Sequence, residues 1–188
     1  MAIMTREALR RALVSARPET PAPEGFRPCA VLVPILGGGE EPRLLFMERA
    51  AQPLDPHSGQ ISFPGGRREE GDADAAATAS RETEEELGLP ARVVEVLGRL
   101  EETLTPTGYC ITPVVGWIER LPALRPDARE VAGVFDVPLA RLADASCRFP
   151  RGEHRIGGRA FEVFEYRAAG RVIWGATARI VATLLALA

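Results

Sequence analysis

Four glutamates stand close together near the middle of this chain of 188 residues, in the segment Arg-Glu-Thr-Glu-Glu-Glu-Leu-Gly-Leu at residues 81–89. Spacings of three and four place Glu82, Glu85 and Glu86 on one face of a helix. Like charges at these spacings cost ~0.2–0.5 kcal/mol each in an exposed helix. The helix dipole adds ~0.3–1 kcal/mol against anions in the last turn. A divalent cation would reverse both costs, so the pattern predicts a Mg²⁺ site, whereas a solvated acidic face is the alternative for an acidic run alone.

A glycine pair precedes this helix in the run Phe63-Pro64-Gly65-Gly66. Two glycines allow a tight turn and leave backbone amides uncovered. Such amides can receive phosphate oxygens, or the turn can simply brace the helix. The glycines are therefore candidate substrate-binding residues whose role depends on their surroundings.

The elements that must position these residues follow from hydrophobic periodicity and from the placement of glycine and proline. We expect Asp72 or Asp74 to cap the acidic helix and Gly88 to end it. The pattern predicts a mixed sheet with helices on both faces, in a domain at residues 29–188 behind an N-terminal helix and a proline-rich linker at residues 1–28. The other expected elements are a helix at 5–16, strands at 29–36, 43–49, 61–63, 93–100 and 110–118, a break at 64–66, a short helix at 137–143, a hairpin at 161–167 and 171–173, and a closing helix from 175.

The composition excludes several classes of protein. The formal net charge is −3, so no overall basic field is present to bind nucleic acid. Three widely separated cysteines predict neither a disulfide framework nor a zinc site and fit a reducing cytoplasm. The apolar tail at residues 180–188 is far shorter than the ~20 residues that a membrane helix needs. We expect a cytoplasmic protein that binds a small molecule rather than nucleic acid or a membrane, and a homodimer is compatible with this sequence.

Together, the glycines and the acidic helix resemble the signature of the Nudix hydrolases, which ends in Arg-Glu-apolar-x-Glu-Glu-x-Gly-apolar. Residues 81–89 match this half, with Thr83 in the apolar position. The resemblance implies a Nudix-type α/β/α sandwich with a mixed sheet between helices. It also implies that Glu82, Glu85 and Glu86 bind metal and that Arg81 holds the loop and the helix together.

The first half of the signature departs from the family. The spacer from Gly66 to Arg81 has one residue more than the general motif, so Ala73 stands where the family has its first glutamate. The missing carboxylate can come from Glu69, Glu70, Asp72 or Asp74, and the sequence does not choose among them.

Further segments resemble the branch of this family that hydrolyses coenzyme A. They are Leu44-Leu45, Arg49, the run from His57 to Gly66 (His-Ser-Gly-Gln-Ile-Ser-Phe-Pro-Gly-Gly), and residues 107–109, 112–116 and 173–179. By this resemblance Arg49, His57, Gly65 and Gly66 bind substrate. The alternatives are that Arg49 pairs with Glu48 or a loop acid and that His57 braces the loop by a hydrogen bond, while His154 is expected to be a solvated residue in a polar turn. Asp55 stands where the branch usually has an arginine, which would alter contacts with an anionic substrate.

The resemblance implies Mg²⁺-dependent hydrolysis of a pyrophosphate linkage, with Mn²⁺ as a substitute ion. Coenzyme A would yield 4′-phosphopantetheine and 3′,5′-ADP, with Glu82, Glu85 and Arg81 as catalytic residues. The general base stays open among Glu82, Glu85 and a loop acid such as Glu130. The alternatives are a Nudix pyrophosphatase for a nucleotide sugar or dinucleotide, a non-catalytic Nudix-like ligand sensor, and a plain α/β scaffold with an acidic helix. The intact glutamate trio argues against the sensor.

Overall fold

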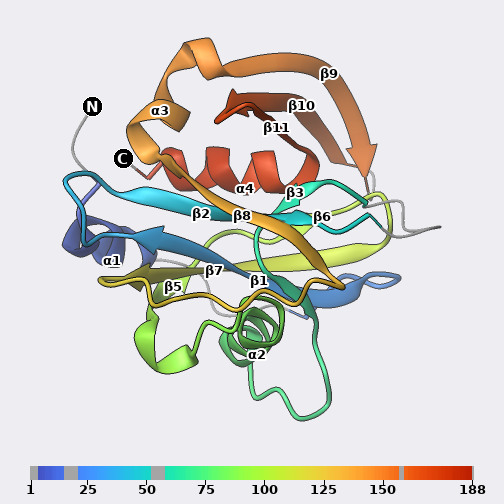
Figure 1. Cartoon of the computed structure of the whole chain (residues 1–188). Helices are drawn as coiled ribbons and strands as arrows, with labels where there is room; N and C mark the ends of the chain where they lie inside the picture. The colour runs from blue at the N-terminus through green and yellow to red at the C-terminus, as the bar shows by residue number, and fades with distance from the viewer. Residues whose placement is uncertain (1–3, 15–20, 52–57, 157–158, 188) are drawn as a thin grey trace.

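A mixed β-sheet forms the centre of the computed structural model, which describes residues 4–14, 21–51, 58–156 and 159–187 (Figure 1). The strand order is β3-β2-β1-β7-β5, while β4 pairs with β1, β6 with β7 and β8 with β2. The strands are β1 Arg27–Leu36, β2 Arg43–Arg49, β3 Ile61–Ser62, β4 Gly65–Arg67, β5 Glu95–Arg99, β6 Thr103–Leu104, β7 Tyr109–Ile118 and β8 Val131–Pro138.

Strands β1 and β7 are parallel along their whole length, from the pair Arg27 and Tyr109 to the pair Leu36 and Ile118. Their apolar, β-branched sequences suit strands covered on both faces. The other pairs in this sheet are antiparallel, which makes the sheet mixed, as the sequence predicted.

Helices cover both faces of this sheet. Helix α2, Ala75–Leu87, packs with Ala30 and Leu32 of β1. Val33 and Ile35 point the other way, into a cluster shared with α1, Arg6–Val14, and α4, Gly175–Leu185. Side chains alternate along a strand, so one apolar strand supplies both cores. The predicted α/β/α sandwich is confirmed.

A second, three-stranded sheet lies over α4 (Figure 1). Its inner side chains Phe164, Tyr166 and Ile173 join the cluster that contains α4. The predicted hairpin is present, but the sequence did not predict the third strand, β9. The remaining elements are β9 Arg148–Ile156, β10 Arg159–Ala168, β11 Arg171–Trp174, α3 Leu139–Ala143 and the 3₁₀ helices η1 Ala91–Val93 and η2 Ala145–Cys147.

Both ends of α2 follow the sequence prediction. The Asp74 side chain accepts a hydrogen bond from the Ala77 backbone N–H at 2.8 Å, which caps the first turn. Gly88 ends the helix with φ 64°, a left-handed conformation that glycine adopts without strain. Thr83 and Leu87 are buried, and Glu86 is buried as well.

Two predictions about strands were wrong. The expected break at residues 64–66 is instead the start of β4, where Gly65 and Gly66 pair with Val31 and Ala30 of β1. Val137, expected to begin a helix, lies in β8, and α3 starts only after Pro138. Both errors concern long-range strand pairing, which local patterns do not report.

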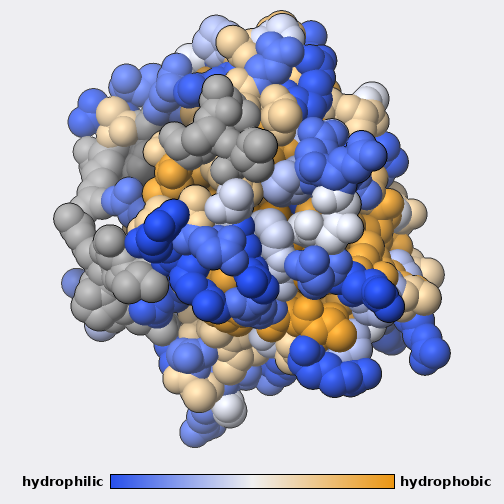
Figure 2. All heavy atoms as spheres, turned by 90° about the vertical axis from the view of Figure 1, so that its left-hand side faces the viewer, coloured by the Kyte–Doolittle hydropathy of each residue, from blue (hydrophilic) through white to orange (hydrophobic). Residues whose placement is uncertain are grey.

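The molecular surface is mixed on the side where α1 and α3 lie. Figure 2 shows apolar residues there in several separate patches with hydrophilic residues between them, apart from the residues drawn in grey. Among the described residues, no helix combines the length and the apolar character needed to cross a membrane.

Candidate functional site

The two inward glutamates of α2 meet the two glycines of β4. Glu86 accepts a hydrogen bond from the Gly65 backbone N–H at 2.8 Å, and only 3% of Glu86 is exposed. A Cβ on Gly66 would lie 2.5 Å from the carboxyl carbon of Glu82. The strand and the carboxylates approach this closely only because neither strand residue carries a side chain.

Gly65 and Gly66 each require glycine, but for different physical reasons. Gly65 has φ +146°, and a Cβ there would lie 2.3 Å from the carbonyl oxygen of Ala30. Gly66 lies outside the positive-φ region, so its requirement is space for Glu82 rather than backbone freedom. The segment expected to form a tight turn is therefore the start of a β-strand, and its first two residues lack side chains.

Burial changes the acidity of both glutamates. It raises the pKa of Glu86 to about 8, with smaller contributions from the charges of Glu82 and Glu130, while the Gly65 N–H and Arg49 oppose the rise. Burial also raises the pKa of Glu82, although Arg81 works against it. A bound cation would stabilise the ionised form of both carboxylates, because burial makes ionisation unfavourable without a nearby positive charge.

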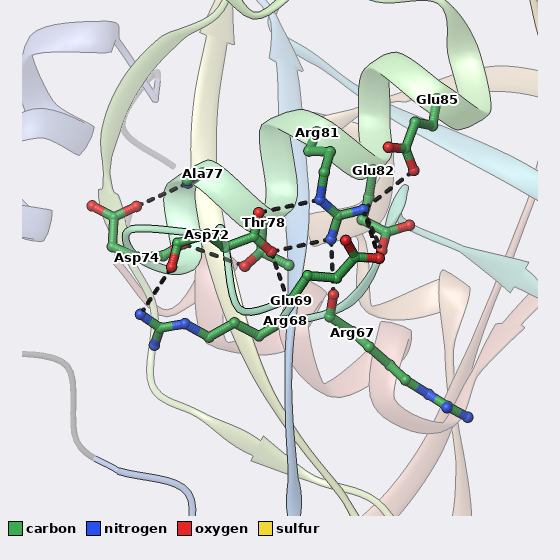
Figure 3. A network of polar contacts seen from close by, with 10 residues as sticks. All are labelled: Arg67, Arg68, Glu69, Asp72, Asp74, Ala77, Thr78, Arg81, Glu82 and Glu85. Carbon is green, nitrogen blue, oxygen red and sulfur yellow. Dashed lines mark hydrogen bonds and ion pairs between the residues drawn. The ribbon is translucent and has the colours of Figure 1, made fainter.

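Arg81 connects the loop before α2 to the helix itself (Figure 3). Its Nε and Nη2 each donate to one oxygen of Asp72 at 3.1 Å, and Nη2 also donates to the Arg67 carbonyl at 2.9 Å. Nη1 donates to Glu82 at 3.1 Å and to Glu85 at 3.2 Å. The guanidinium holds the pKa of Asp72 well below its usual range.

These contacts choose among the four acids left open by the sequence. The Asp72 side chain is 7% exposed and faces Arg81 with both oxygens. Asp74 caps α2, the Glu69 carboxylate is 3.9 Å from Arg81 and largely exposed, and Glu70 is exposed. Of these four acids, Asp72 makes the closest contact with Arg81.

The three expected metal ligands do not stand alike. Glu82 and Glu86 lie against β4, whereas the Glu85 side chain is 60% exposed and ion-paired with Arg81. In the described part of the chain, no three metal-binding side chains already converge. Arg81, which donates to both Glu82 and Glu85, is the group that links Glu85 to Glu82.

A cleft of about 920 Å³ borders β4, and both Gly65 and Gly66 line it. Its described charged lining comprises four arginines and a single glutamate, Glu162. This surplus of positive charge favours an anionic ligand. The arginines are Arg27, Arg49, Arg67 and Arg179.

Arg49, a predicted substrate-binding residue, lies in the cleft wall. Its neighbour Glu48, a suggested partner, pairs instead with Arg171 at 3.4 Å. His57 and Asp55 lie outside the described residues. His154, which the sequence suggested was a solvated turn residue, is on β9 and lines the cleft.

Distant parts of the sequence meet in this cleft. Its walls include residues 60–63 around β3, residues 105–107 before β7, and residues 174–177 at the start of α4. The parallel pairing of β1 with β7 and the placement of α4 beside β3 bring them together. Thr177 at the start of α4 donates to the Ile61 carbonyl at 3.1 Å.

Comparisons with known proteins agree on one family. A model described as "NUDIX domain" matches residues 26–142. The "Uncharacterized Nudix hydrolase NudL" of Yersinia pestis (strain Pestoides F) is 39% identical over 155 residues, which cover 82% of this chain and 76% of that protein. The protein of the same name from Yersinia pseudotuberculosis (serotype O:1b) has the same identity and coverage.

Solved structures are similar in fold. A NUDIX hydrolase from Alicyclobacillus acidocaldarius superposes with a TM-score of 0.56 at 18% identity, covering 86% of this chain and 91% of that one. RenU, a Nudix hydrolase from M. smegmatis, superposes with a TM-score of 0.53 at 24% identity, covering 64% and 75%. At these identities the likeness concerns the fold alone.

Proposed function

The chain belongs to the Nudix hydrolase family, enzymes that hydrolyse pyrophosphate bonds in nucleoside diphosphate derivatives with divalent metal ions, and we propose that this member acts on coenzyme A or its derivatives. The products would be 4′-phosphopantetheine and 3′,5′-ADP. This proposal narrows the family's chemistry to one substrate class.

One observation carries the choice of substrate. Segments that resemble the coenzyme A branch lie far apart in the sequence, yet they all contribute to one cleft, which is lined by residues 60–63, Gly65, Gly66, Thr107, Tyr109 and residues 174–177. Four arginines there suit a substrate with several phosphates. The apolar lining, including Ile111 and Phe164, suits an arm that is not charged.

We propose that Glu82, Glu85 and Glu86 hold Mg²⁺, for which Mn²⁺ can substitute. Carboxylate oxygens are the hard donors that Mg²⁺ prefers, and the buried, high-pKa Glu86 is the kind of group that a cation stabilises. Bound there, the ion would neutralise the diphosphate and acidify a water molecule.

The protein's own groups position the reaction. Arg81 donates to Glu82, which lies beside the glycine strand, and to Glu85. Gly65 and Gly66 leave the cleft wall free of side chains next to the carboxylates, and Arg49 supplies positive charge for the substrate. The attacking water gives its proton to Glu82, Glu85 or Glu130.

Replacing Glu130 tests which of these three residues is the general base. If Glu130 accepts the proton, Glu130→Gln should lower kcat by ~10²–10⁴-fold and leave Mg²⁺ affinity unchanged. If kcat survives, the base is Glu82 or Glu85. Isothermal titration with Mg²⁺ beside steady-state kinetics makes the distinction.

Mass spectrometry of coenzyme A incubated with the protein and Mg²⁺ tests the proposal. We expect 4′-phosphopantetheine and 3′,5′-ADP. Intact coenzyme A, with cleavage of a nucleotide sugar or a dinucleotide in the same assay, would overturn the substrate assignment. Ligand binding without hydrolysis of any compound would instead indicate a sensor.

The proposal also covers the setting of the enzyme. We propose a catalytic domain at residues 29–188, preceded by the N-terminal helix and linker at 1–28. We also propose a cytoplasmic location, which the free thiols of Cys29, Cys110 and Cys147 support, and a nucleotide-type small molecule rather than nucleic acid or a membrane as partner. A homodimer, which the sequence allows, can be tested by light scattering.

A further inference from the structure

Two arginines share one tyrosine ring at the cleft. Arg27 of β1 and Tyr109 of β7 are register partners, and the Arg27 Cζ lies 4.3 Å from the ring centroid. The Arg67 Cζ lies 5.5 Å from the same centroid, and Arg67 Nη2 donates to the Tyr109 hydroxyl at 2.7 Å. All three side chains line the cleft.

The guanidinium groups are oriented by neutral partners. Besides the ring, Arg27 Nη2 donates to the Thr107 carbonyl at 3.4 Å. The Arg67 backbone is held by Arg81, while its side chain extends away from the cluster around Arg81 (Figure 3). The two cations therefore have defined positions before any ligand arrives, which lowers the entropy cost of binding.

Among the residues that the structure describes, no carboxylate forms an ion pair that compensates the charge of Arg27 or Arg67. Both arginines are exposed. Two like charges against one ring repel each other, so an anion between them would be stabilised by both. Guanidinium forks match phosphate oxygens in geometry as well as in charge.

The pair stands apart from the expected site of bond cleavage. Arg67 follows Gly66 directly in β4, and Gly66 lies against Glu82, but the Arg67 side chain extends away from the contacts around Arg81 that include Glu82 (Figure 3). An anion bound by the pair would accordingly be separate from a diphosphate beside Glu82 and Glu86.

We propose that Arg27, Arg67 and Tyr109 form a subsite for a phosphate monoester that the substrate carries apart from its scissile diphosphate. This inference rests on the proposed function and deepens it, because coenzyme A has such a monoester and dephospho-coenzyme A lacks it. The arginines bind the phosphate, and Tyr109 positions both arginines.

The test compares kcat/KM for coenzyme A and dephospho-coenzyme A. Wild type should prefer coenzyme A, and Arg27→Gln and Arg67→Gln should each lower this preference about tenfold, mainly through KM. Tyr109→Phe keeps the ring but removes the acceptor of Arg67, so its loss should be smaller. Arg92→Gln, an exposed arginine outside the cleft, makes the same change in net charge and should leave the preference unchanged.

Equilibrium binding keeps this inference separate from the choice of substrate. Adenosine 3′,5′-bisphosphate should bind wild type about tenfold more tightly than AMP, and both arginine variants should lose this difference. Equal binding of the two nucleotides to wild type, or an unchanged difference in the variants, would overturn the subsite. A difference that the arginines control, with no cleavage of coenzyme A, would overturn only the proposed substrate.

Discussion

Replacing Glu86 by glutamine should stabilise the protein without metal and abolish its turnover. Glu86 is 3% exposed and receives one hydrogen bond, from the Gly65 N–H at 2.8 Å. Glutamine keeps the shape and an oxygen that can accept this bond. The substitution therefore removes the charge while it preserves the packing.

The magnitude follows from the raised pKa. In the unfolded chain a glutamate titrates near 4.5, whereas in the folded protein Glu86 titrates at about 8. The folded state binds more protons between these values, so stability is full below the lower value and falls as pH rises toward the upper one. At pH 7 this loss amounts to about 3 kcal/mol, from 1.36 kcal/mol per pKa unit.

Glutamine avoids this loss but buries an amide. Burying the glutamine amide costs about 1 kcal/mol, which offsets part of this gain in stability. A net gain of about 2 kcal/mol corresponds to a rise in Tm of roughly 4–8 °C for a domain of this size. The gain should shrink as pH falls and vanish near pH 5.

The assay is differential scanning calorimetry between pH 5 and 8 in the presence of a chelator. Glu84→Gln is the matched control, because Glu84 is exposed on the same helix and loses the same charge. Its Tm should follow that of wild type. Adding Mg²⁺ should raise the Tm of wild type and leave Glu86→Gln unaffected, since the variant has lost a carboxylate ligand.

Two results would refute this reasoning. A Glu86→Gln protein that is no more stable than wild type at pH 8 would show that Glu86 is not a buried group with a raised pKa. Wild-type turnover by the same variant in Mg²⁺ would show that Glu86 does not bind the catalytic metal.

Further predictions concern the neighbours of this carboxylate. Gly66→Ala should lower kcat about 100-fold, because its Cβ would lie 2.5 Å from the Glu82 carboxyl carbon, whereas the control Gly71→Ala, with open space around it, should keep full activity in the same kinetic assay. Asp72→Asn should cost about 2 kcal/mol in chemical denaturation at pH 7, since it breaks the two-pronged contact with Arg81. The depressed pKa of Asp72 means that this wild-type advantage holds above about pH 4 and disappears as pH falls further, and an equal difference at pH 2 would contradict the assignment.

Features that depend on near neighbours were predictable from the sequence. The helix that carries the glutamates begins behind Asp74 and ends at Gly88 as expected, because a cap is a contact between residues a few positions apart. The apolar runs that became β1 and β2 were found for a similar reason, since an apolar, β-branched run suits a buried strand. Strands β8 and β9 were missed, and β4 was taken for a turn. These strands are specified by pairing with other strands rather than by their local sequence.

The candidate site likewise has features that the sequence predicted and features that it did not predict. Residue spacing placed Glu82 and Glu86 on one helix, and the raised cost of that acidic turn predicted a cation. Spacing could not say that Glu86 would be buried against Gly65, or that Asp72 rather than three other acids would face Arg81. Those contacts depend on how the loop before α2 folds back onto the helix. Several similar acidic side chains compete for the same arginine, and residue spacing does not decide among them.

The sequence by itself determined the family, the acidic helix and the pyrophosphate chemistry, because a short run of residues at fixed spacing specifies them. Only the tertiary structure decided what surrounds that chemistry. It placed α4 and the loop before β7 around the same cleft as the glycine strand, and it set Arg27 and Arg67 on one face of that cleft with Tyr109. The parallel pairing of β1 with β7 makes this contact, and the free energy of such pairing comes from the whole sheet rather than from any local segment.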